Sequence, residues 1–220
     1  MQDYRVQSLA QALRVFTRHA SPFLLIMIIV SFVALRFGTD HSFSTFELSI
    51  AGAVALYWPF QEWWMHRFLL HLPPIPWRGQ SYEMNFARVH RLHHADPKDF
   101  KLIFLPLTAI LAALIAFTAF FYLLSGNQAY TYTWMATATT STLLYEWVHF
   151  LTHTDYRPKG KYYRKIWRLH RLHHYKNEHY WYSFTVPWVD QWLGTGPQPK
   201  EVPHSSTAQQ LNGISEQGND

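Results

Sequence analysis

Histidines are the most chemically informative residues of this chain. Ten of its fourteen histidines fall into four motifs: HRFLLH at 66–71, HRLHH at 90–94, HFLTH at 149–153 and HRLHH at 170–174. The ten are His66, His71, His90, His93, His94, His149, His153, His170, His173 and His174. Because the chain has no cysteine, any bound metal must be held by His, Asp or Glu. Two matched sets of histidines are hard to explain by packing alone, so they predict metal binding.

The spacing within the motifs favours two metal ions. His149 and His153 are four residues apart, so on a helix their rings share one face and can share one ion. His66 and His71 are five apart and would diverge by about 140° on an α-helix, which suits two neighbouring ions better than one. The adjacent histidines of the repeated HRLHH motif must also diverge, by about 100°. HRFLLH and both HRLHH motifs are therefore expected to serve two sites, whereas HFLTH can serve one.

The ligand type narrows the choice of metal. Neutral imidazole suits zinc, copper, iron and nickel, whereas magnesium and calcium prefer oxygen ligands. Zinc can occupy such a site in purified protein, but it has no redox chemistry. A site saturated with histidine leaves few groups for hydrolysis, so we expect two iron ions that activate O2 as a co-substrate.

Three residues beside the motifs are candidates for supporting roles. Glu62 precedes His66 by four residues and Glu146 precedes His149 by three, spacings at which side chains meet on a helix. Each carboxylate either accepts the imidazole N–H and orients the ligand, or pairs with Arg or Lys at the membrane interface. His179 follows the last motif and is either an extra ligand or a group that supports one.

Four apolar runs must position these motifs. The runs cover about 21–37, 46–60, 102–124 and 129–145, and the spans that they predict cover about 21–37, 46–71, 102–124 and 129–153. The third contains 23 uncharged residues, against the roughly 20 that a helix needs to cross a bilayer. The second and fourth can continue as helix through the first and third motifs and so bring histidines to the membrane edge. We therefore predict an all-α integral membrane protein with four transmembrane helices in two hairpins.

Charge predicts the orientation of these helices. The loops at 38–45 and 125–130 contain no Lys or Arg, and eighteen of the nineteen basic residues lie on the other side, with only Arg36 at the outer end of the first span. By the positive-inside rule, both termini and all histidine motifs should be cytoplasmic. The net charge of +5 comes from residues that flank apolar runs, so an anionic membrane surface, and not nucleic acid, is the expected partner.

The two ends of the chain differ from its middle. Residues 1–20 are expected to form an amphipathic interfacial helix, or alternatively a frayed lead-in, and they lack the cleavage pattern of a signal peptide. Residues 21–196 form the predicted membrane domain. Residues 197–220 are rich in Gln, Ser, Asn and Gly, which predicts a disordered tail.

The four motifs in this order resemble the fatty acid hydroxylase / sterol desaturase superfamily of membrane di-metal enzymes. The resemblance covers about 51–196 and includes the segment PWVDQWLGT at 187–195. It implies four membrane helices under a cytoplasmic helical cap that carries the histidine boxes. It also implies O2 as oxidant and hydrogen abstraction from an unactivated C–H bond of a lipid.

The resemblance further implies how the ligands divide. One ion would take His66, His90, His93, His170 and His173, and the other would take His71, His94, His149, His153 and His174. No haem domain like cytochrome b5 precedes the first span, so we expect a separate electron donor of the cytochrome b5 or ferredoxin type. Where relatives often have Asn-Tyr-Gly, this chain has Trp181-Tyr182-Ser183, which leaves the subfamily and substrate open.

The leading functional hypothesis is hydroxylation of a fatty acyl chain within a lipid. Desaturation, or oxidation of a sterol or carotenoid, remains open because the same metal centre supports each reaction. A metal transporter or other non-enzymatic metal-binding membrane protein would predict ionisable residues inside the spans, and 102–124 contains no charged residue. A di-haem electron carrier would need histidines facing each other at membrane depth, whereas these cluster at one edge.

Overall fold

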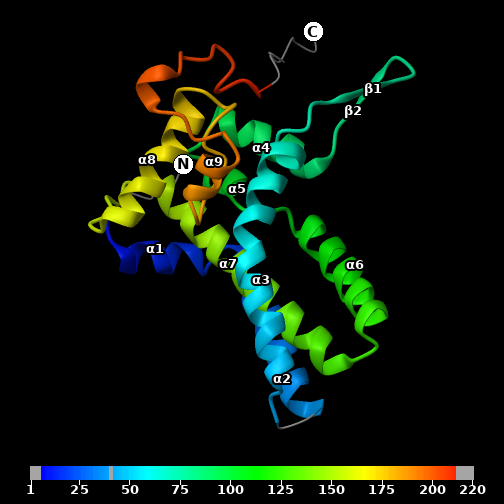
Figure 1. Ribbon diagram of the computed structural model, residues 1–220. Helices are drawn as coiled ribbons and strands as arrows, with labels where there is room; N and C mark the ends of the chain where they lie inside the picture. Colours follow the sequence, from blue (N-terminus) through cyan, green and yellow to red (C-terminus); the bar gives the residue numbers. More distant parts are fainter. Residues whose placement is uncertain (1–5, 40–41, 212–220) are drawn as a thin grey trace.

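Four long helices form the body of the molecule. The computed structural model describes residues 6–39 and 42–211. The long helices are α2 (Ala20–Thr39), α3 (Thr45–Trp64), α6 (Leu107–Ser125) and α7 (Gln128–Thr152). Helix α7 packs against each of the other three, so it forms the centre of the bundle (Figure 1). The fold is mostly helical, as the apolar runs predict.

In the part of the chain that the structure describes, two segments are long and apolar enough to cross a membrane, Ala20–Thr39 and Phe100–Ser125. The outward face of α6 leaves large side chains such as Leu111, Ile115 and Leu123 exposed. A soluble domain rarely exposes apolar surface on this scale, whereas lipid-facing helices do. The chain is therefore a membrane protein.

Two of the predicted helices are not regular α-helices over their whole length. Helix α3 continues into a π-helical segment, η1 (Met65–Leu70), in which the His71 N–H donates to the His66 carbonyl at 3.3 Å. The run at 102–124, predicted as one continuous helix, is instead divided into α5 (Phe100–Ile103) and α6. Pro106 explains the division, because proline lacks an N–H and disfavours helical backbone in the residue before it.

A short N-terminal helix, α1 (Leu9–Phe16), lies across the bundle (Figure 1). It begins with a capping box in which Ser8 and Gln11 bond to each other's backbone N–H groups. Phe16 is buried in a cluster that includes Phe104 and Phe150, whereas other apolar side chains of α1 are exposed. Of the predicted helix at 1–20, residues 1–5 lie outside the described residues.

The remaining elements gather at one end of the bundle (Figure 1). They are α4 (Asn85–Ala95), α8 (Lys161–Tyr175), α9 (Trp188–Trp192) and the 3-10 helix η2 (Pro199–Glu201). An antiparallel hairpin of β1 (Ile75–Trp77) and β2 (Gln80–Tyr82), with Ile75 opposite Tyr82, projects from this end. These elements carry six of the motif histidines, on α4 and α8.

The predicted disordered tail is wrong for residues 197–211. Val202, Ala208 and Leu211 are buried, and the Ser205 N–H donates to the carbonyl of Lys176 at 2.8 Å. The hydroxyls of Ser205 and Thr207 donate to the Glu178 carboxylate, and the Asn177 side chain donates to the Pro203 carbonyl, so polar contacts just after α8 dock the segment together with its apolar side chains. Contacts of this kind cannot be predicted from the average composition of a segment. Residues 212–220 lie outside the described residues.

A buried ion pair joins three helices at the end of the bundle away from the histidines. Arg36 of α2 and Glu47 of α3 are each only 3% exposed, and Arg36 Nη2 lies 2.7 Å from Glu47 Oε2. The Thr133 hydroxyl of α7 donates to the same carboxylate at 2.8 Å. The single basic residue on this side of the predicted membrane is therefore neutralised by a structural contact, as a charge in a low-dielectric region must be.

Candidate metal centre

The ten motif histidines converge from η1, α4, α7 and α8 and the residues that end η1 and α7, and they form two groups. The first group is His66, His71, His90, His94 and His173, and the second is His93, His149, His153, His170 and His174. Within each group the potential ligand atoms all lie within 4.8 Å of one another. All ten side chains are buried except that of His71, which is half-buried. Two compact sets of buried nitrogen donors suit two metal ions.

Helix geometry explains how α4 and α8 serve both groups. Adjacent residues on a helix point about 100° apart, so His93 and His94 enter different groups, and so do His173 and His174. Each HRLHH motif thus links the two groups, as its spacing predicts. His149 and His153, one α-helical turn apart, lie together in the second group, also as predicted.

The expectation that His66 and His71 point toward different ions is wrong. Both lie in the first group, because η1 is π-helical and its wider turn brings residues five apart onto one face. The ligand division implied by the resemblance also differs from the structure. His93 and His170 lie with the second group, and His71 and His94 lie with the first.

Distances between ring nitrogens test whether a metal fits. Nε2 of His93 lies 3.1 Å from Nε2 of both His149 and His153, and His153 Nε2 lies 2.8 Å from His170 Nε2. An imidazole nitrogen has one proton or one lone pair, so His93 cannot hydrogen-bond well to two others. Two nitrogens about 2.1 Å from one ion, at right angles, would be about 3 Å apart. The donor set therefore fits a metal ion.

Unpaired nitrogens support the same conclusion. Among the described residues, buried ring nitrogens without a hydrogen-bond partner include Nε2 of His94 and both nitrogens of His174. An unpaired buried polar atom is costly, and coordination would remove that cost. Ring nitrogens also approach one another closely in the first group, as they do in the second. Nε2 of His66 lies 3.1 Å from Nε2 of His90, and Nε2 of His71 lies 3.2 Å from Nε2 of His173.

Backbone carbonyls orient three of the rings. The Nδ1–H groups of His66, His173 and His94 donate to the carbonyls of Tyr182 at 2.6 Å, Tyr180 at 2.7 Å and Ala208 at 2.8 Å, respectively. Since a carbonyl only accepts, Nδ1 carries the proton and Nε2 is left to bind a metal. Sequence reasoning missed these acceptors because a backbone carbonyl has no side-chain signature.

Burial keeps the histidines of α4 and α8 neutral. It lowers the pKa of His90, His94 and His170 well below the usual value, and nearby histidines lower it further. Burial likewise lowers the pKa of His173 to about 4. Neutral imidazole is the form that binds metal, so these four residues are in the ligand state near neutral pH.

Neither proposed role for Glu62 and Glu146 is found in the structure. Glu62 accepts hydrogen bonds from the backbone N–H groups of Phe184 at 3.0 Å and Thr185 at 2.7 Å. Glu146 accepts from the Ser21 hydroxyl and from the backbone N–H of Leu105. Buried backbone donors in neighbouring loops require acceptors, and they take these carboxylates in place of the histidines or the basic residues.

The loop at 180–185 connects Glu62 to the metal centre. The Phe184 ring lies 4.6 Å from the rings of His66 and His170, so it contacts a histidine of each group. Asp190 of α9 holds the same loop, because its carboxylate accepts from the backbone N–H groups of Tyr182 and Ser183, both at 2.9 Å. The PWVDQWLGT segment was the available sequence signal for this support, but its role was not predicted.

His179 does not join either histidine group. Its side chain is 68% exposed, and its Nε2 lies 3.5 Å from the carboxylate of Glu178. The possibility that it is an extra ligand is therefore not supported by its position.

Comparison with known proteins agrees with the histidine pattern. Residues 51–195 match the family described as fatty acid hydroxylase. The dihydroceramide fatty acyl 2-hydroxylase of Arabidopsis thaliana is 26% identical over 153 residues, which cover 69% of this chain and 62% of that protein. The fatty acid 2-hydroxylase of Mus musculus is 31% identical over 122 residues, or 55% of this chain and 32% of that protein.

A yeast relative provides both a sequence and a structural match. The ceramide very long chain fatty acid hydroxylase of Saccharomyces cerevisiae is 28% identical over 140 residues, or 63% of this chain and 35% of that protein. The structure of full-length Scs7p, in which only the hydroxylase domain is visible, superposes with a TM-score of 0.69. It covers 88% of this chain and 72% of that chain at 23% sequence identity, which shows a shared fold.

The matched regions cover only part of each relative's length. The chain spans 62% of the plant relative and only 32% and 35% of the mouse and yeast relatives. The family match, however, runs from residue 51 to residue 195 and contains all four histidine motifs. This chain therefore belongs to the fatty acid hydroxylase family.

Proposed function

We propose that this chain is an O2-dependent, di-iron membrane enzyme that hydroxylates an aliphatic C–H bond on the fatty acyl chain of a lipid. The observation that carries the proposal is an apolar cavity with His66 of the first histidine group in its wall. A lipid chain in that cavity would reach a metal ion held by this group.

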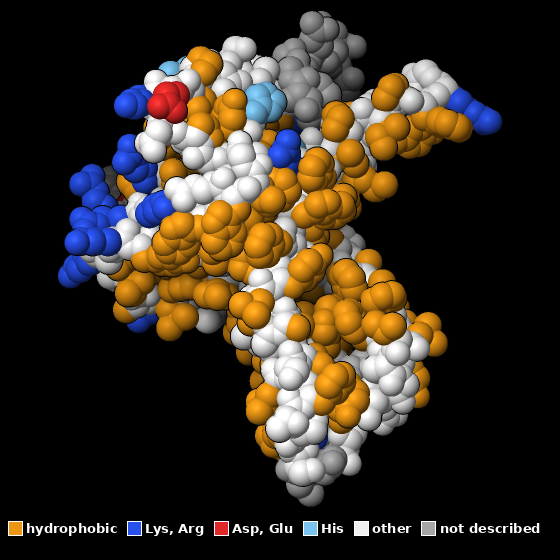
Figure 2. Space-filling view, viewed as in Figure 1, with side chains coloured by type: hydrophobic (Ala, Val, Ile, Leu, Met, Phe, Trp, Pro, Cys, Tyr) orange, Lys and Arg blue, Asp and Glu red, His pale blue; other side chains and the backbone are white. Residues whose placement is uncertain are grey.

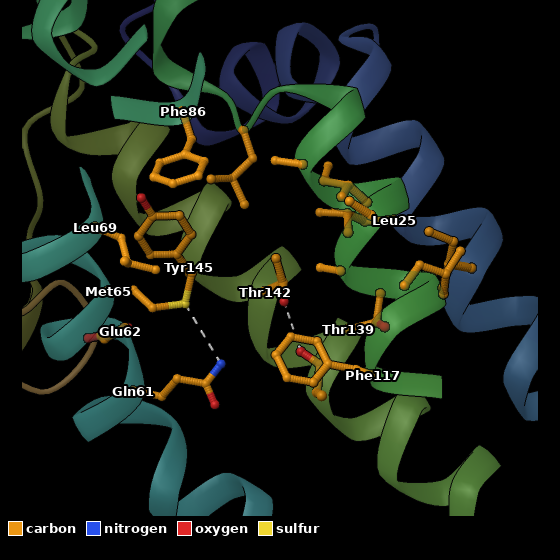
Figure 3. Close-up of a pocket in the computed structure, with 18 of the residues that line it drawn as sticks. Leu25, Gln61, Glu62, Met65, Leu69, Phe86, Phe117, Thr139, Thr142 and Tyr145 are labelled. Atoms are coloured by element: carbon orange, nitrogen blue, oxygen red, sulfur yellow. Dashed lines mark hydrogen bonds between the residues drawn. The ribbon is translucent and has the colours of Figure 1, made fainter. Parts of the chain in front are cut away.

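The cavity has the apolar lining that an acyl chain requires. It has a volume of about 460 Å³ and lies between α2, α3, α6 and α7. Leu25, Leu69, Phe86 and Phe117 are among the apolar residues that surround it (Figure 3), and the ring of Tyr145, also in its wall, stacks on that of His149 at 5.7 Å. Apolar walls bind a hydrocarbon chain and keep water from the reacting carbon.

One polar side chain in the wall is available to the substrate. The Gln61 carboxamide extends toward the cavity (Figure 3), and its nitrogen has only the weak acceptor Sδ of Met65, at 3.9 Å. A hydrogen bond to the lipid's carbonyl or hydroxyl would give this amide a better partner. Gln61 would then fix which carbon of the chain lies next to His66.

The reaction requires a reductant as well as a metal. Hydroxylation replaces one C–H bond by C–OH, and the second oxygen atom of O2 leaves as water after uptake of two electrons and two protons. The two iron ions, when bound, supply the one-electron redox chemistry that neutral side chains lack. The ten histidines would hold these ions, and a separate protein of the cytochrome b5 or ferredoxin type would supply the electrons.

The proposed membrane arrangement follows from charge and apolar surface. Helices α2, α3, α6 and α7 are the four spans, and α4, α8 and α9 form the cytoplasmic cap. Helix α1 lies at the interface, where its exposed Leu9 and Leu13 contact lipid. The buried pairing of Arg36 with Glu47 supports this orientation, since the one basic residue of the outer side is neutralised.

Product analysis distinguishes hydroxylation from the other reactions that the same metal centre would support. Desaturation, or oxidation of a sterol or carotenoid, needs the same metals and differs in how the substrate lies next to them. Metal transport is disfavoured because the cavity wall offers few polar groups along which an ion could move.

Metal content is the first test. Protein purified in detergent without chelators should contain about two metal ions per chain, because there are two histidine groups. Replacing both His93 and His94 by Ala removes one ligand from each group and should lower the content of both. His204→Ala changes an exposed histidine outside the groups and should retain the metal.

Activity is the second test. Iron-restored protein, supplied with ferredoxin, its reductase, NADPH and O2, should add one oxygen atom to a lipid acyl chain, as measured by mass spectrometry of extracted lipids. The proposal is wrong if metal-replete protein oxidises no lipid while a control hydroxylase, assayed with the same donor, is active.

A further inference from the structure

Helix α8 has two chemically different faces. His170, His173 and His174 point into the metal centre, and on the other side stand Lys161, Arg164, Lys165 and Arg168. At 100° per residue, the two sets are centred about 170° apart around the helix. The basic face is therefore the outer surface of the helix that carries the metal ligands.

The four cations line a groove. Its volume is about 400 Å³, and α8 forms one side of it while Trp181, Gln191 and residues 196–199 form the other. Lys and Arg side chains gather on this flank of the molecule (Figure 2). Among the described residues, no carboxylate lies within ion-pair distance of any of the four. Cations this close repel one another, so the groove favours an anion.

The start of α8 strengthens the positive field. The helix begins after Gly160, which provides no side-chain cap, and its first turn contains no acidic residue. The first N–H groups of a helix lack internal partners and carry partial positive charge. Lys161 stands in this first turn, where a cation is unfavourable for the helix itself. Its position is better explained by a ligand than by helix stability.

Aromatic residues connect the groove to the membrane surface. Lys165 Nζ lies 4.9 Å from the ring centroid of Trp188, at the start of α9. One turn later, Trp192 is 68% exposed and stacks at 6.0 Å on Phe60 of α3, which is 38% exposed. Exposed tryptophan beside an apolar span marks the depth of the lipid headgroups. The groove therefore lies where a lipid phosphate would be.

We propose that this groove binds the phosphate group of an anionic phospholipid whose acyl chains lie against α3 near Phe60. The site is separate from the apolar cavity, because the two share no lining residue. It rests on the membrane placement in the proposed function but not on hydroxylation. An acidic protein would also be attracted to the cations, yet only a lipid would use the apolar surface of Phe60 and Trp192 as well.

Native mass spectrometry of the purified protein tests the proposal. Protein in neutral detergent would be titrated with dioleoyl phosphatidylglycerol and separately with dioleoyl phosphatidylcholine. We expect tighter binding of phosphatidylglycerol, and a loss of about tenfold or more when Arg164 and Arg168 are both replaced by Gln. Replacing Lys161 and Lys165 by Gln provides a second pair from the same groove.

A matched control removes two charges elsewhere. Arg157→Gln with Lys159→Gln changes two exposed cations that do not line the groove and should leave lipid affinity unchanged. Metal content of each variant, measured on the same samples, shows that the centre is intact. Loss of metal or of hydroxylation in the unmodified protein would count against the proposed function and not against this site.

Three results would overturn the lipid assignment. The first is equal affinity for the two phospholipids, and the second is unchanged phosphatidylglycerol binding in both groove variants. The third is competition by inorganic phosphate as effective as competition by phosphatidylglycerol, which would indicate a free-phosphate site. Unchanged lipid binding together with weaker binding of an acidic [2Fe–2S] ferredoxin would assign the groove to a protein partner.

Discussion

Backbone carbonyls determine which nitrogen three of the histidines present to the metal centre. The carbonyls of Tyr180 and Tyr182 accept from His173 and His66 of the first group. Both carbonyls belong to a loop whose position depends on the carboxylates of Asp190 and Glu62. Ligand orientation therefore depends on residues that never touch a metal, and outer partners of this kind alter metal affinity measurably.

Asp190→Asn should weaken metal binding in the first group without changing any histidine. The amide keeps only one acceptor oxygen for the N–H groups of Tyr182 and Ser183, so the carbonyl facing His66 becomes less well fixed. We expect about tenfold weaker affinity for one of the two ions, measured by competition with a chelator. Asp155→Asn, at an exposed position, is the control, and equal affinities in all three proteins would contradict the argument.

At the scale of elements, spacing predicted the contacts that depend only on regular helix. The placement of His149 beside His153, and the separation of His93 from His94, follow from regular α-helical geometry. The pairing of His66 with His71 did not, because no residue in HRFLLH signals a π-helix. The same limit applies to Glu62, whose partners lie in a loop more than a hundred residues away.

The docked segment at 197–211 shows a second limit of sequence reasoning. Its polar composition predicts disorder, yet the Ala208 carbonyl accepts from His94 in the first histidine group. A single backbone contact in the right place gives the segment a role in the metal centre. Such a contact depends on the three-dimensional course of the chain, which composition does not contain.

Deleting Phe68 should test the π-helix directly. Removing one residue between His66 and His71 would reduce their spacing from five to four, and residues four apart lie on one face of an ordinary α-helix. We therefore expect His71 to remain in the first group and both ions to be retained. Elemental analysis would then give about two ions per chain.

The substitution Phe68→Ala removes the side chain without changing the helix register, so it shows whether the side chain alone affects metal binding. Phe68 is largely exposed, so its truncation should leave both ions bound. Loss of one ion in the deletion variant but not in Phe68→Ala would show that the π-helical turn itself is needed to bring His71 to the first group. Loss of both ions would show that the two groups form one cooperative site.

At the scale of the whole molecule, the metal centre joins the bundle to the cap. His66, His149 and His153 come from the helices of the bundle and their extensions, and the remaining ligands of both groups include residues of α4 and α8. Metal binding therefore holds together parts that otherwise meet through neutral, buried imidazoles. A ligand that binds only the folded state raises its stability, so chelation should lower the melting temperature.

The metal-free protein should lose stability as pH falls from about 6.5 toward 4. In the folded chain, burial holds the pKa of His173 at about 4 and keeps those of His90 and His170 well below the usual value. The unfolded chain has ordinary histidines that take up protons below about pH 6.5, so acid favours unfolding by up to about 1.4 kcal/mol per pH unit for each such group. Thermal unfolding of chelated protein between pH 8 and 5 measures this slope. Replacing His93 and His94 by Gln should make it shallower and His204→Gln should not, whereas a melting temperature that stays constant or rises on acidification would show that these imidazoles are protonated in the fold.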